Sequence, residues 1–464
     1  MVAFEITGLP HKRTPISQGT DGYYTMPPPP PRIATTPHTR SKRIGVLLGG
    51  LGAISTTLIA GVEAIKKGLA QPVGSLALLG TINVGSEEEP RHVRIRDYLD
   101  LPGPQDLDNL AFGAWDVVPT DGYAAARLAG ALEVDLIDSL AHELASIRAW
   151  PGIFDPRFNR RSDISFFKQG RNFLDLAEQV QQDILRFQAE HVLERCVFLW
   201  CGSTEAYLDV APAHQTLARF EAAMLESDHA VIAPSMIYAY AAIALGIPFV
   251  NATPSRTVDI PALMELAARY EVPIAGKDLK TGQTLIKTIL APGLRDRMLG
   301  LHGWYSTNIL GNGDGATLED PDAFRTKQES KLSVLNSILR PDLYPELYDH
   351  LHHQVRINYY PPRGDNKESW DAIDIFGWLG YPMSIKIDFL CRDSILAAPL
   401  LLDLALFMDL AKQAHASGPQ EWLSFYFKSP LCVDPHPPEH ELSRQLAKLR
   451  QALPTLVRAR AAAV

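Results

Sequence analysis

The sequence predicts an α/β protein with a Rossmann-like, doubly wound parallel sheet and an inserted α+β unit. Three observations support this prediction. From residue 43 to about residue 281, short apolar runs alternate with helix-like stretches, a pattern typical of a parallel sheet covered on both faces. A glycine-rich turn follows the first apolar run, and after about residue 282 the pattern changes to β-type runs around a polar, glycine-rich stretch.

The composition is that of an ordinary soluble globular protein. The chain has 464 residues, of which 46% are hydrophobic, and this length predicts two large domains or three smaller ones. Asp and Glu outnumber Lys and Arg by 53 to 44, which gives a net charge of −9. We therefore expect no nucleic acid partner, because phosphates bind basic surfaces. A local lysine cluster for a small anionic substrate is compatible with this charge.

Neither the apolar stretches nor the cysteines indicate a membrane or secreted protein. Residues 44–62 and 230–255 are interrupted by glycine, proline or hydroxyl side chains, so we expect no membrane-spanning helix. We also expect no secretory signal, because no apolar segment opens the chain. Reduced, mostly buried thiols in a cytoplasmic protein are expected from the spacing of the four cysteines, which are Cys196, Cys201, Cys391 and Cys432.

The first elements follow from composition. Residues 1–42 hold eight of the 35 prolines, which predicts an extended or disordered arm without chemistry. Ile44–Leu48 is an apolar run bounded by charge and glycine, hence a buried strand. A helix over Ser55–Gly68 and a strand over Ser75–Leu79 would complete a βαβ unit.

Later segments continue the alternation and then depart from it. Strands are predicted at Trp115–Val118, Cys196–Trp200 and Pro248–Asn251, with helices around Asp163–Ala189, Leu217–Leu225 and up to Ala244, and with an apolar segment at His229–Ala233. The second unit is predicted to hold a helix over Pro321–Leu339 and strands over Val355–Tyr360 and Ser384–Leu390, before an apolar helix over Ser394–Met408. The pair His352 and His353 has no partner at metal-ligand spacing, so we expect it on a surface helix.

The glycine-rich turn is a candidate cofactor site. Gly50, Gly52 and Ser55 make a near match to the G-x-G-x-x-G pattern, whose backbone N–H groups bind a pyrophosphate. The alternative is a tight βα turn that only needs small residues. No acidic residue ends the predicted second strand, where Thr81–Asn83 lies. Asp116 is therefore the candidate for recognising the ribose.

Several unusual motifs occur in a fixed order, and together they resemble the myo-inositol-1-phosphate synthase family over roughly residues 44–432. They are Phe112–Asp116, Ala233–Ser235, Asn251–Pro254, Ile274–Thr284, Asn308–Gly315, Ser330–Lys331, Gly364–Lys367, Asp393–Pro399 and Phe427–Pro430. Two positions depart from the family pattern. The turn reads Gly-Leu-Gly-Ala-Ile-Ser where many members have G-x-G-G-N-N-G, and Lys277-Asp278 replaces the usual acidic or amide dipeptide.

The resemblance implies an NAD-dependent isomerase. The family converts glucose 6-phosphate to inositol phosphate by oxidation at C5, enolisation, intramolecular aldol closure and reduction, with NAD regenerated in each cycle, and it serves inositol and phospholipid biosynthesis. A homotetramer built by the inserted unit is implied in the same way. Bacterial and archaeal members often use a divalent cation, but no ligand cluster is visible here, so substrate phosphate and cofactor would mainly hold it.

The resemblance also implies the site residues and the domain limits. The implied catalytic lysines are Lys327, Lys331, Lys367 and Lys428. The implied substrate contacts are Thr281, Asn308, Asn312, Asp314, Leu318 and Ile357. The implied cofactor contacts are Gly50, Leu51, Gly52, Ala53, Ile54, Asp116, Gly202, Ser235, Asp278 and Asp393. The expected parts are an arm (1–42), an NAD-binding domain (43–281), a catalytic and oligomerisation domain (282–395) and a helical segment returning to the first domain (396–464).

Lysines suit this chemistry on physical grounds. The substrate phosphate, the alkoxide and the enolate are all anionic, and positioned ammonium groups stabilise such charge in a dry site. Lys327 and Lys331 are four residues apart and would share a helix face; the alternative is snorkelling along the helix edge. Taken alone, Lys367 is also compatible with a solvated turn and Asp393 with a helix cap.

Two other functions stay open at this point. A sugar-phosphate oxidoreductase or cyclase of the same fold would act on another substrate and, if a dehydrogenase, release NADH. A non-catalytic NAD-binding homologue would be expected to lose the lysines, yet all four positions are lysine here.

Overall fold

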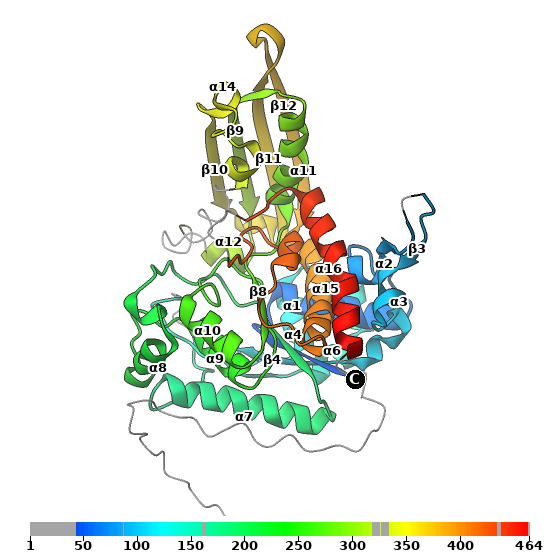
Figure 1. Cartoon of the computed structure of the whole chain (residues 1–464). Coiled ribbons are helices and arrows are strands. Elements are labelled where there is room, and N and C mark those ends of the chain that lie inside the picture. The colour runs from blue at the N-terminus through cyan, green and yellow to red at the C-terminus, as the bar shows by residue number, and fades with distance from the viewer. Residues whose placement is uncertain are drawn as a thin grey trace, which may run out of the picture. The chain divides into compact units, whose positions relative to one another are not determined.

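The computed structural model describes residues 43–86, 88–159, 164–317, 325, 334–433 and 438–462. The proline-rich arm and most of the predicted helix over 321–339 therefore lie outside the described residues. Within the described part, two large sheets organise the chain (Figure 1).

The larger sheet has seven strands in the order β13-β8-β7-β6-β1-β4-β5, and every neighbouring pair is parallel. The order β5-β4-β1-β6-β7-β8 is that of a doubly wound nucleotide-binding sheet, in which the strand order reverses at the central strand β1. The strands are β1 (Ile44–Gly49), β4 (Leu110–Asp116), β5 (Ala149–Pro151), β6 (Cys196–Trp200), β7 (Phe249–Asn251), β8 (Pro273–Gly276) and β13 (Gly418–Pro419).

Side chains alternate between the two faces of this sheet, as the pleat requires. Val46 and Leu48 pack into one apolar core, whereas Leu47 packs into the other. The first core is covered by α1 (Ala53–Lys66), α4 (Gly122–Ala129) and α15 (Asp393–Gln413). The second is covered by α7 (Phe173–His191), α8 (Leu217–Glu226), α9 (Pro234–Ala244) and α10 (Pro261–Arg269).

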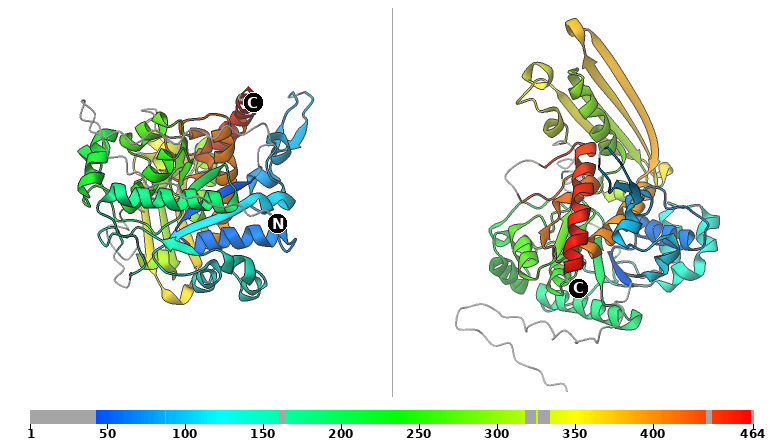
Figure 2. Two further views of the ribbon diagram at one scale, coloured as in Figure 1. Left: turned by 90° about the horizontal axis from the view of Figure 1, so that it is seen from below. Right: turned by 45° about the vertical axis from the view of Figure 1, so that its right-hand side comes forward.

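The smaller sheet has the order β10-β9-β11-β12, with β10 parallel to β9 and the other two pairs antiparallel. A third apolar core lies between this sheet and the helices α11 (Gly282–Asp296) and α14 (Pro345–Tyr348). In Figures 1 and 2 the turn between β11 and β12 projects past these helices. The strands are β9 (Gly300–Leu310), β10 (His352–Tyr359), β11 (Asn366–Phe376) and β12 (Pro382–Arg392).

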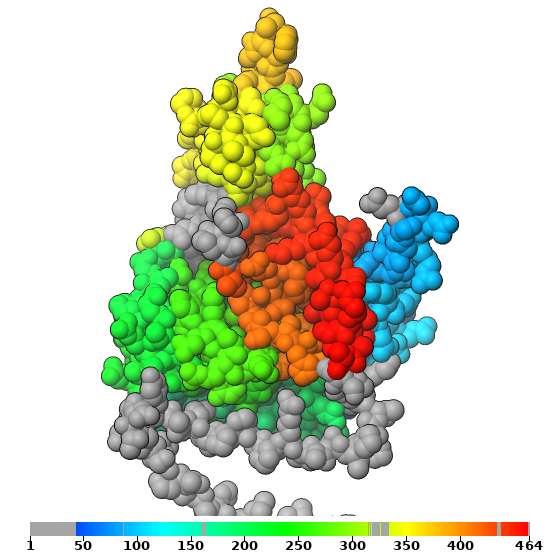
Figure 3. All heavy atoms as spheres, in the orientation of Figure 1, coloured from blue at the N-terminus to red at the C-terminus, as the bar shows by residue number. Residues whose placement is uncertain are grey.

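The chain then returns to the large sheet. Helix α15 is long and apolar enough to cross a membrane, but 78% of its most apolar 18-residue stretch is buried inside the protein. A 3₁₀ turn, η5 (Glu421–Tyr426), and the helix α16 (Leu442–Ala462) follow, and α16 contacts both α15 and η5. Figure 3 shows α16 at the surface beside this segment. The remaining elements are α2 (Leu76–Leu79), β2 (Thr81–Asn83), β3 (His92–Arg94), α3 (Ile95–Leu99), η1 (Pro104–Asn109), α5 (Val134–Ser139), α6 (Ala141–Ser146), η2 (Pro212–His214), α12 (Gly313–Thr317), η3 (Pro361–Arg363) and η4 (Trp378–Gly380).

Three expectations were wrong. Ser75–Leu79 is the short helix α2, because Asp403 accepts hydrogen bonds from the Ser75 hydroxyl and the first backbone N–H groups of that helix. His352 and His353, expected on a surface helix, begin strand β10. All four cysteines are free thiols, but only Cys196 is fully buried.

Candidate active site

The carboxyl ends of the parallel strands meet at one edge of the large sheet, and the glycine-rich turn lies there. The Gly49 carbonyl accepts a hydrogen bond from the Cys201 N–H beyond β6, at 2.9 Å. The Gly50 N–H donates to the Trp115 carbonyl on β4, also at 2.9 Å. The turn therefore lies between the ends of β4 and β6, the two strands that flank β1. Doubly wound sheets bind their ligands at this point.

The backbone of the turn leaves room for an anion. Gly50 has φ +106°, and a Cβ there would lie 3.0 Å from both the Cys201 carbonyl oxygen and the Gly202 Cα. Gly52 is the N-cap of α1, and a Cβ there would point into open space. No acidic side chain occupies the first turn of α1. The start of α1 therefore fits the pyrophosphate of a dinucleotide, which helix N–H groups bind.

The third position of the glycine pattern is Ser55, and the structure explains how it is accommodated. Its side chain is buried, and its hydroxyl donates to the Gly50 carbonyl at 2.6 Å. Ala53 and Ile54 complete the first turn of α1 beside Leu51.

Asp116 ends β4, the strand beside β1. Its Oδ2 accepts a hydrogen bond from the Leu51 N–H at 2.7 Å, and its Oδ1 accepts from the Val118 N–H at 3.0 Å. An acidic residue at this place in the fold is the one expected to face the adenosine ribose. Its carboxylate also fastens the glycine-rich turn.

Ser235 lies at the start of α9 and is fully buried. Its N–H and hydroxyl donate to the two carboxyl oxygens of Glu205, at 2.8 and 2.6 Å. Thr257 donates to the Ser235 hydroxyl at 2.9 Å. Burial raises the pKa of Glu205 to about 7. Glu205 was not predicted from the sequence, and no motif around it indicates that it accepts hydrogen bonds from Ser235.

The first lysine–aspartate pair joins the loop after β8 to the segment after η5. Lys428 Nζ lies 2.9 Å from Asp278 Oδ1, and both side chains are buried. The backbone supports the pair, because the Lys428 N–H donates to the Asp278 carbonyl and the Asp278 N–H donates to the Thr253 carbonyl beyond β7. Asp278 has φ +60°. The buried charges are thus held by three different parts of the chain.

A second lysine–aspartate pair lies where the small sheet joins the large one. Lys367 at the start of β11 has its Nζ 2.5 Å from Oδ2 of Asp393, the first residue of α15. Gly282 begins α11 with φ +55°, and a Cβ there would lie 3.3 Å from Asp393 Oδ1 and 3.4 Å from Lys367 Nζ. The N-terminus of α11, with Thr281 as its buried N-cap, therefore abuts this pair.

The predicted substrate residues of the small sheet connect to the same place. Asn308 on β9 faces Ile357 on β10 in the strand register, and its Nδ2 donates to Gln283 Oε1 on α11 at 2.5 Å. Asn312 Nδ2 donates to Asp365 at 2.8 Å, and Asp365 accepts from the Ser394 hydroxyl at 2.5 Å. Burial raises the pKa of Asp365. Ser394 follows Asp393, so this chain of contacts ends at the second lysine pair.

Several predicted residues cannot be placed. Lys327, Lys331 and Leu318 lie outside the described residues, and of Asp314 only the backbone, in α12, is described. Among the described residues, no group of three or more His, Cys, Asp or Glu side chains could hold a metal ion. The requirement for a divalent cation stays a prediction.

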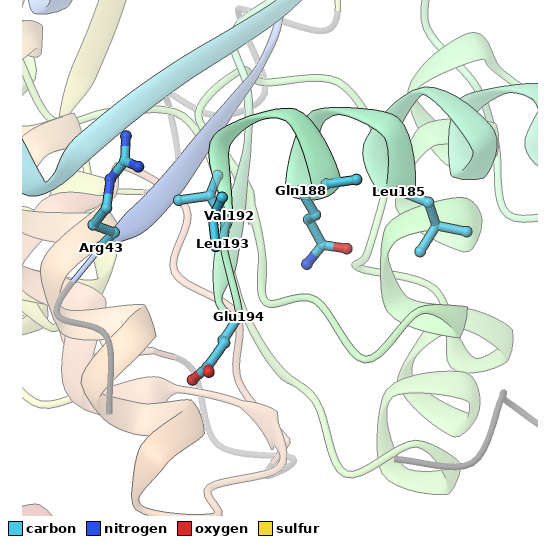
Figure 4. Close-up of a pocket in the computed structure, with 7 residues that line it drawn as sticks. Arg43, Leu185, Gln188, Val192, Leu193 and Glu194 are labelled. Atoms are coloured by element: carbon cyan, nitrogen blue, oxygen red, sulfur yellow. The ribbon is translucent and has the colours of Figure 1, made fainter. Parts of the chain in front are cut away.

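A surface hollow lies at the opposite end of β1 from the glycine-rich turn. Arg43 before β1 and the end of α7 line it, including Gln188 and Val192 (Figure 4). Its lining holds neither the predicted lysines nor the turn, so it is separate from the candidate active site.

Sequence reasoning missed two buried lysines next to the site. Lys280 donates to Gln445 Oε1 on α16, and burial lowers its pKa to about 7. Lys287 lies 2.7 Å from His353 Nε2, and burial lowers its pKa to about 8. Lys280 lies inside the Ile274–Thr284 motif, so the motif itself was the available signal.

Lys280 should make stability depend on pH. Its pKa falls from 10.5 to about 7 on folding, so between these values the unfolded chain holds a proton that the folded protein has released. The free energy of unfolding should therefore rise with pH in this window. Lys280→Met should reduce that slope, whereas the exposed-site control Lys386→Met should keep it. Denaturant titrations at several pH values measure both, and an unchanged slope in Lys280→Met would contradict the assignment.

The fold and the site define a class: a dinucleotide-binding α/β protein with two buried lysines, each paired with a carboxylate, at the end of its sheet. The family model described as Myo-inositol-1-phosphate synthase matches residues 44–453. The chain belongs to this family.

Named relatives agree with this assignment. The chain is 49% identical over 416 residues to inositol-3-phosphate synthase 1 of Bacteroides thetaiotaomicron, covering 89% of this chain and 96% of the relative. It is 32% identical to inositol-3-phosphate synthase 1 of Oryza sativa, covering 91% and 86%. The crystal structure of inositol-3-phosphate synthase from Caenorhabditis elegans superposes with a TM-score of 0.82 at 27% identity, covering 90% and 86%.

Proposed function

We propose that this protein is an inositol-3-phosphate synthase, an isomerase that converts D-glucose 6-phosphate to 1D-myo-inositol 3-phosphate for inositol and phospholipid biosynthesis. The observation that carries the proposal is the pair of buried ammonium groups, Lys367 and Lys428, held by Asp393 and Asp278 around the start of α11. They supply the positive charge that a sugar phosphate and its enolate need.

The glycine-rich turn, Asp116 and the start of α1 would hold NAD, which when bound would take the hydride from C5 of the sugar phosphate and return it to that carbon after ring closure. The N-terminus of α11 offers backbone N–H groups to the substrate phosphate, since Thr281 gives it no side-chain cap. Each carboxylate partner fixes its lysine ammonium in place. The ammonium groups then stabilise the oxyanions that develop at the reacting carbons.

A direct assay tests the proposal. The protein is incubated with glucose 6-phosphate and NAD, and inositol phosphate and NADH are both quantified over many turnovers. We expect inositol phosphate to accumulate without net NADH. Accumulation of NADH in step with substrate loss would instead establish a sugar-phosphate dehydrogenase. A divalent cation added or chelated in the same assay tests that requirement.

A homotetramer built through the small sheet is part of the same proposal. The turn between β11 and β12 exposes Trp378 (87%), Leu379 (79%) and Tyr381 (70%), and Met383 at the adjoining end of β12 is 45% exposed. Large apolar side chains grouped in this way mark protein–protein interfaces.

Charged substitutions in this turn should therefore break the assembly. We expect the double variant Trp378→Asp, Tyr381→Asp to lower the molar mass measured by light scattering. Val73→Asp, at a site that is 77% exposed elsewhere on the chain, should keep the mass of wild type. A double variant with the wild-type mass would refute this interface.

A further inference from the structure

The layer between α11 and the small sheet changes from apolar to polar along its length. Near the end of α11, Ala291 and Leu294 belong to the apolar core beneath the sheet. Near its start, the buried residues facing this layer are polar and include Gln283 on α11 and Asp371 on β11. Buried polar groups need hydrogen-bond partners, so the partners reveal how each amide is turned.

The side-chain amide of Gln283 has a single possible orientation. Its Nε2 lies 3.1 Å from the Thr307 carbonyl, 3.2 Å from the Trp370 carbonyl and 3.1 Å from Asp371 Oδ2. Carbonyl and carboxylate oxygens only accept hydrogen bonds, so the group facing them must be the NH₂. Oε1 then faces Asn308, where it accepts from Nδ2 at 2.5 Å.

Asp371 is itself held in place. Its Oδ1 accepts from Trp304 Nε1 at 2.8 Å and from the Ser306 hydroxyl at 2.5 Å. Oδ2 is thereby directed at Gln283. The direction of hydrogen bonding is fixed from Asp371 through Gln283 to Asn308.

The last member of this chain presents an acceptor. Asn308 is 1% exposed, and its Nδ2 is used by Gln283 and, at 3.4 Å, by the Arg356 carbonyl. Its Oδ1 is buried and accepts no hydrogen bond from any residue that the structure describes. A buried acceptor of this kind needs a donor.

We propose that Asp371 and Gln283 are positioning residues that fix Asn308 as a hydrogen-bond acceptor, and that Asn308 Oδ1 binds a hydroxyl group of the sugar phosphate and not its phosphate. A hydroxyl donates, whereas a phosphate dianion only accepts. The inference rests on the proposed function and adds which substrate group Asn308 recognises.

The test is calorimetry on the NAD-loaded protein with glucose 6-phosphate and with analogues that each lack one hydroxyl. Gln283→Met and Asn308→Leu should each raise the Kd for glucose 6-phosphate about tenfold. The double variant should bind no worse than Asn308→Leu, because both changes act through one amide. One deoxy analogue should bind equally to wild type and to Asn308→Leu.

Gln420→Met is the matched control. Gln420 is also buried, with its Nε2 donating to two backbone carbonyls and its Oε1 accepting from Trp422 Nε1. This control should lower Tm but leave the Kd unchanged. Additive losses in the double variant, or equal discrimination against every deoxy analogue by wild type and Asn308→Leu, would overturn the proposal.

The Asn308→Leu series tests the hydroxyl even if Gln283→Met does not fold. Failure of the proposed function looks different: wild type would then bind no glucose 6-phosphate, and the inference would fall with it.

Discussion

Gly52→Val should abolish binding of NAD while leaving the protein folded. A Cβ at Gly52 meets no protein atom within 4 Å, so the substitution is tolerated sterically, and replacing this N-cap glycine should lower stability by only about 1 kcal/mol. The open space in front of α1 is where a pyrophosphate would bind the helix N–H groups. The valine methyl groups would fill it, and we expect at least a ~100-fold loss of NAD affinity by calorimetry, equivalent to about 2.7 kcal/mol.

A second glycine on the same helix provides the control. A Cβ at Gly61 also meets no atom within 4 Å, and Gly61 lies two turns further along α1. Gly61→Val should bind NAD like wild type. If Gly52→Val retains wild-type affinity, the cofactor does not bind at this turn and the assignment of Gly50 to Ile54 fails with it.

The parallel sheet was predictable because its strands are short apolar runs with strong boundaries. The second strand was misplaced because Ser75–Leu79 is equally apolar, and only a distant residue, Asp403 on α15, makes it a helix. Asp116 is the last residue of β4, and its role at the ribose stays a prediction. It lies beside the turn because β4, and not the segment after α1, pairs with β1.

The lysine pairs show where sequence reasoning stops. Lys367 looks like a solvated turn residue in its local sequence, but it is buried and bonded to Asp393, 26 residues away. Only the family motif singled it out. Gln283 and Asp371 were missed although Gln283 lies in the Ile274–Thr284 motif, because their role depends on contacts between α11 and β11. Local pattern cannot indicate such contacts.

Lys428→Met should remove most of the turnover. The ammonium of Lys428 lies 2.9 Å from Asp278 Oδ1, and both side chains are buried. Loss of a positioned charge-stabilising or acid–base group lowers turnover by about 100-fold or more. Because Asp278 would be left buried without its lysine, stability should also fall, by about 3 kcal/mol. Inositol phosphate formed per unit time at saturating NAD, with the denaturation midpoint, measures both effects.

Lys168→Met separates the two effects. Lys168 and Asp183 form an ion pair at 2.6 Å with side chains that are 8% and 9% exposed, close to the 6% and 4% of Lys428 and Asp278. Breaking either pair leaves a buried carboxylate. Asp183 keeps the Trp115 Nε1–H at 2.9 Å and Arg186 at 4.0 Å, so Lys168→Met should lower stability by no more than Lys428→Met does. Only Lys428→Met should lose turnover, because only that ammonium lies beside the loop after β8 that leads into the start of α11. If both variants turn over within a few-fold of wild type, Lys428 is a structural ion pair and the reacting charge is stabilised elsewhere.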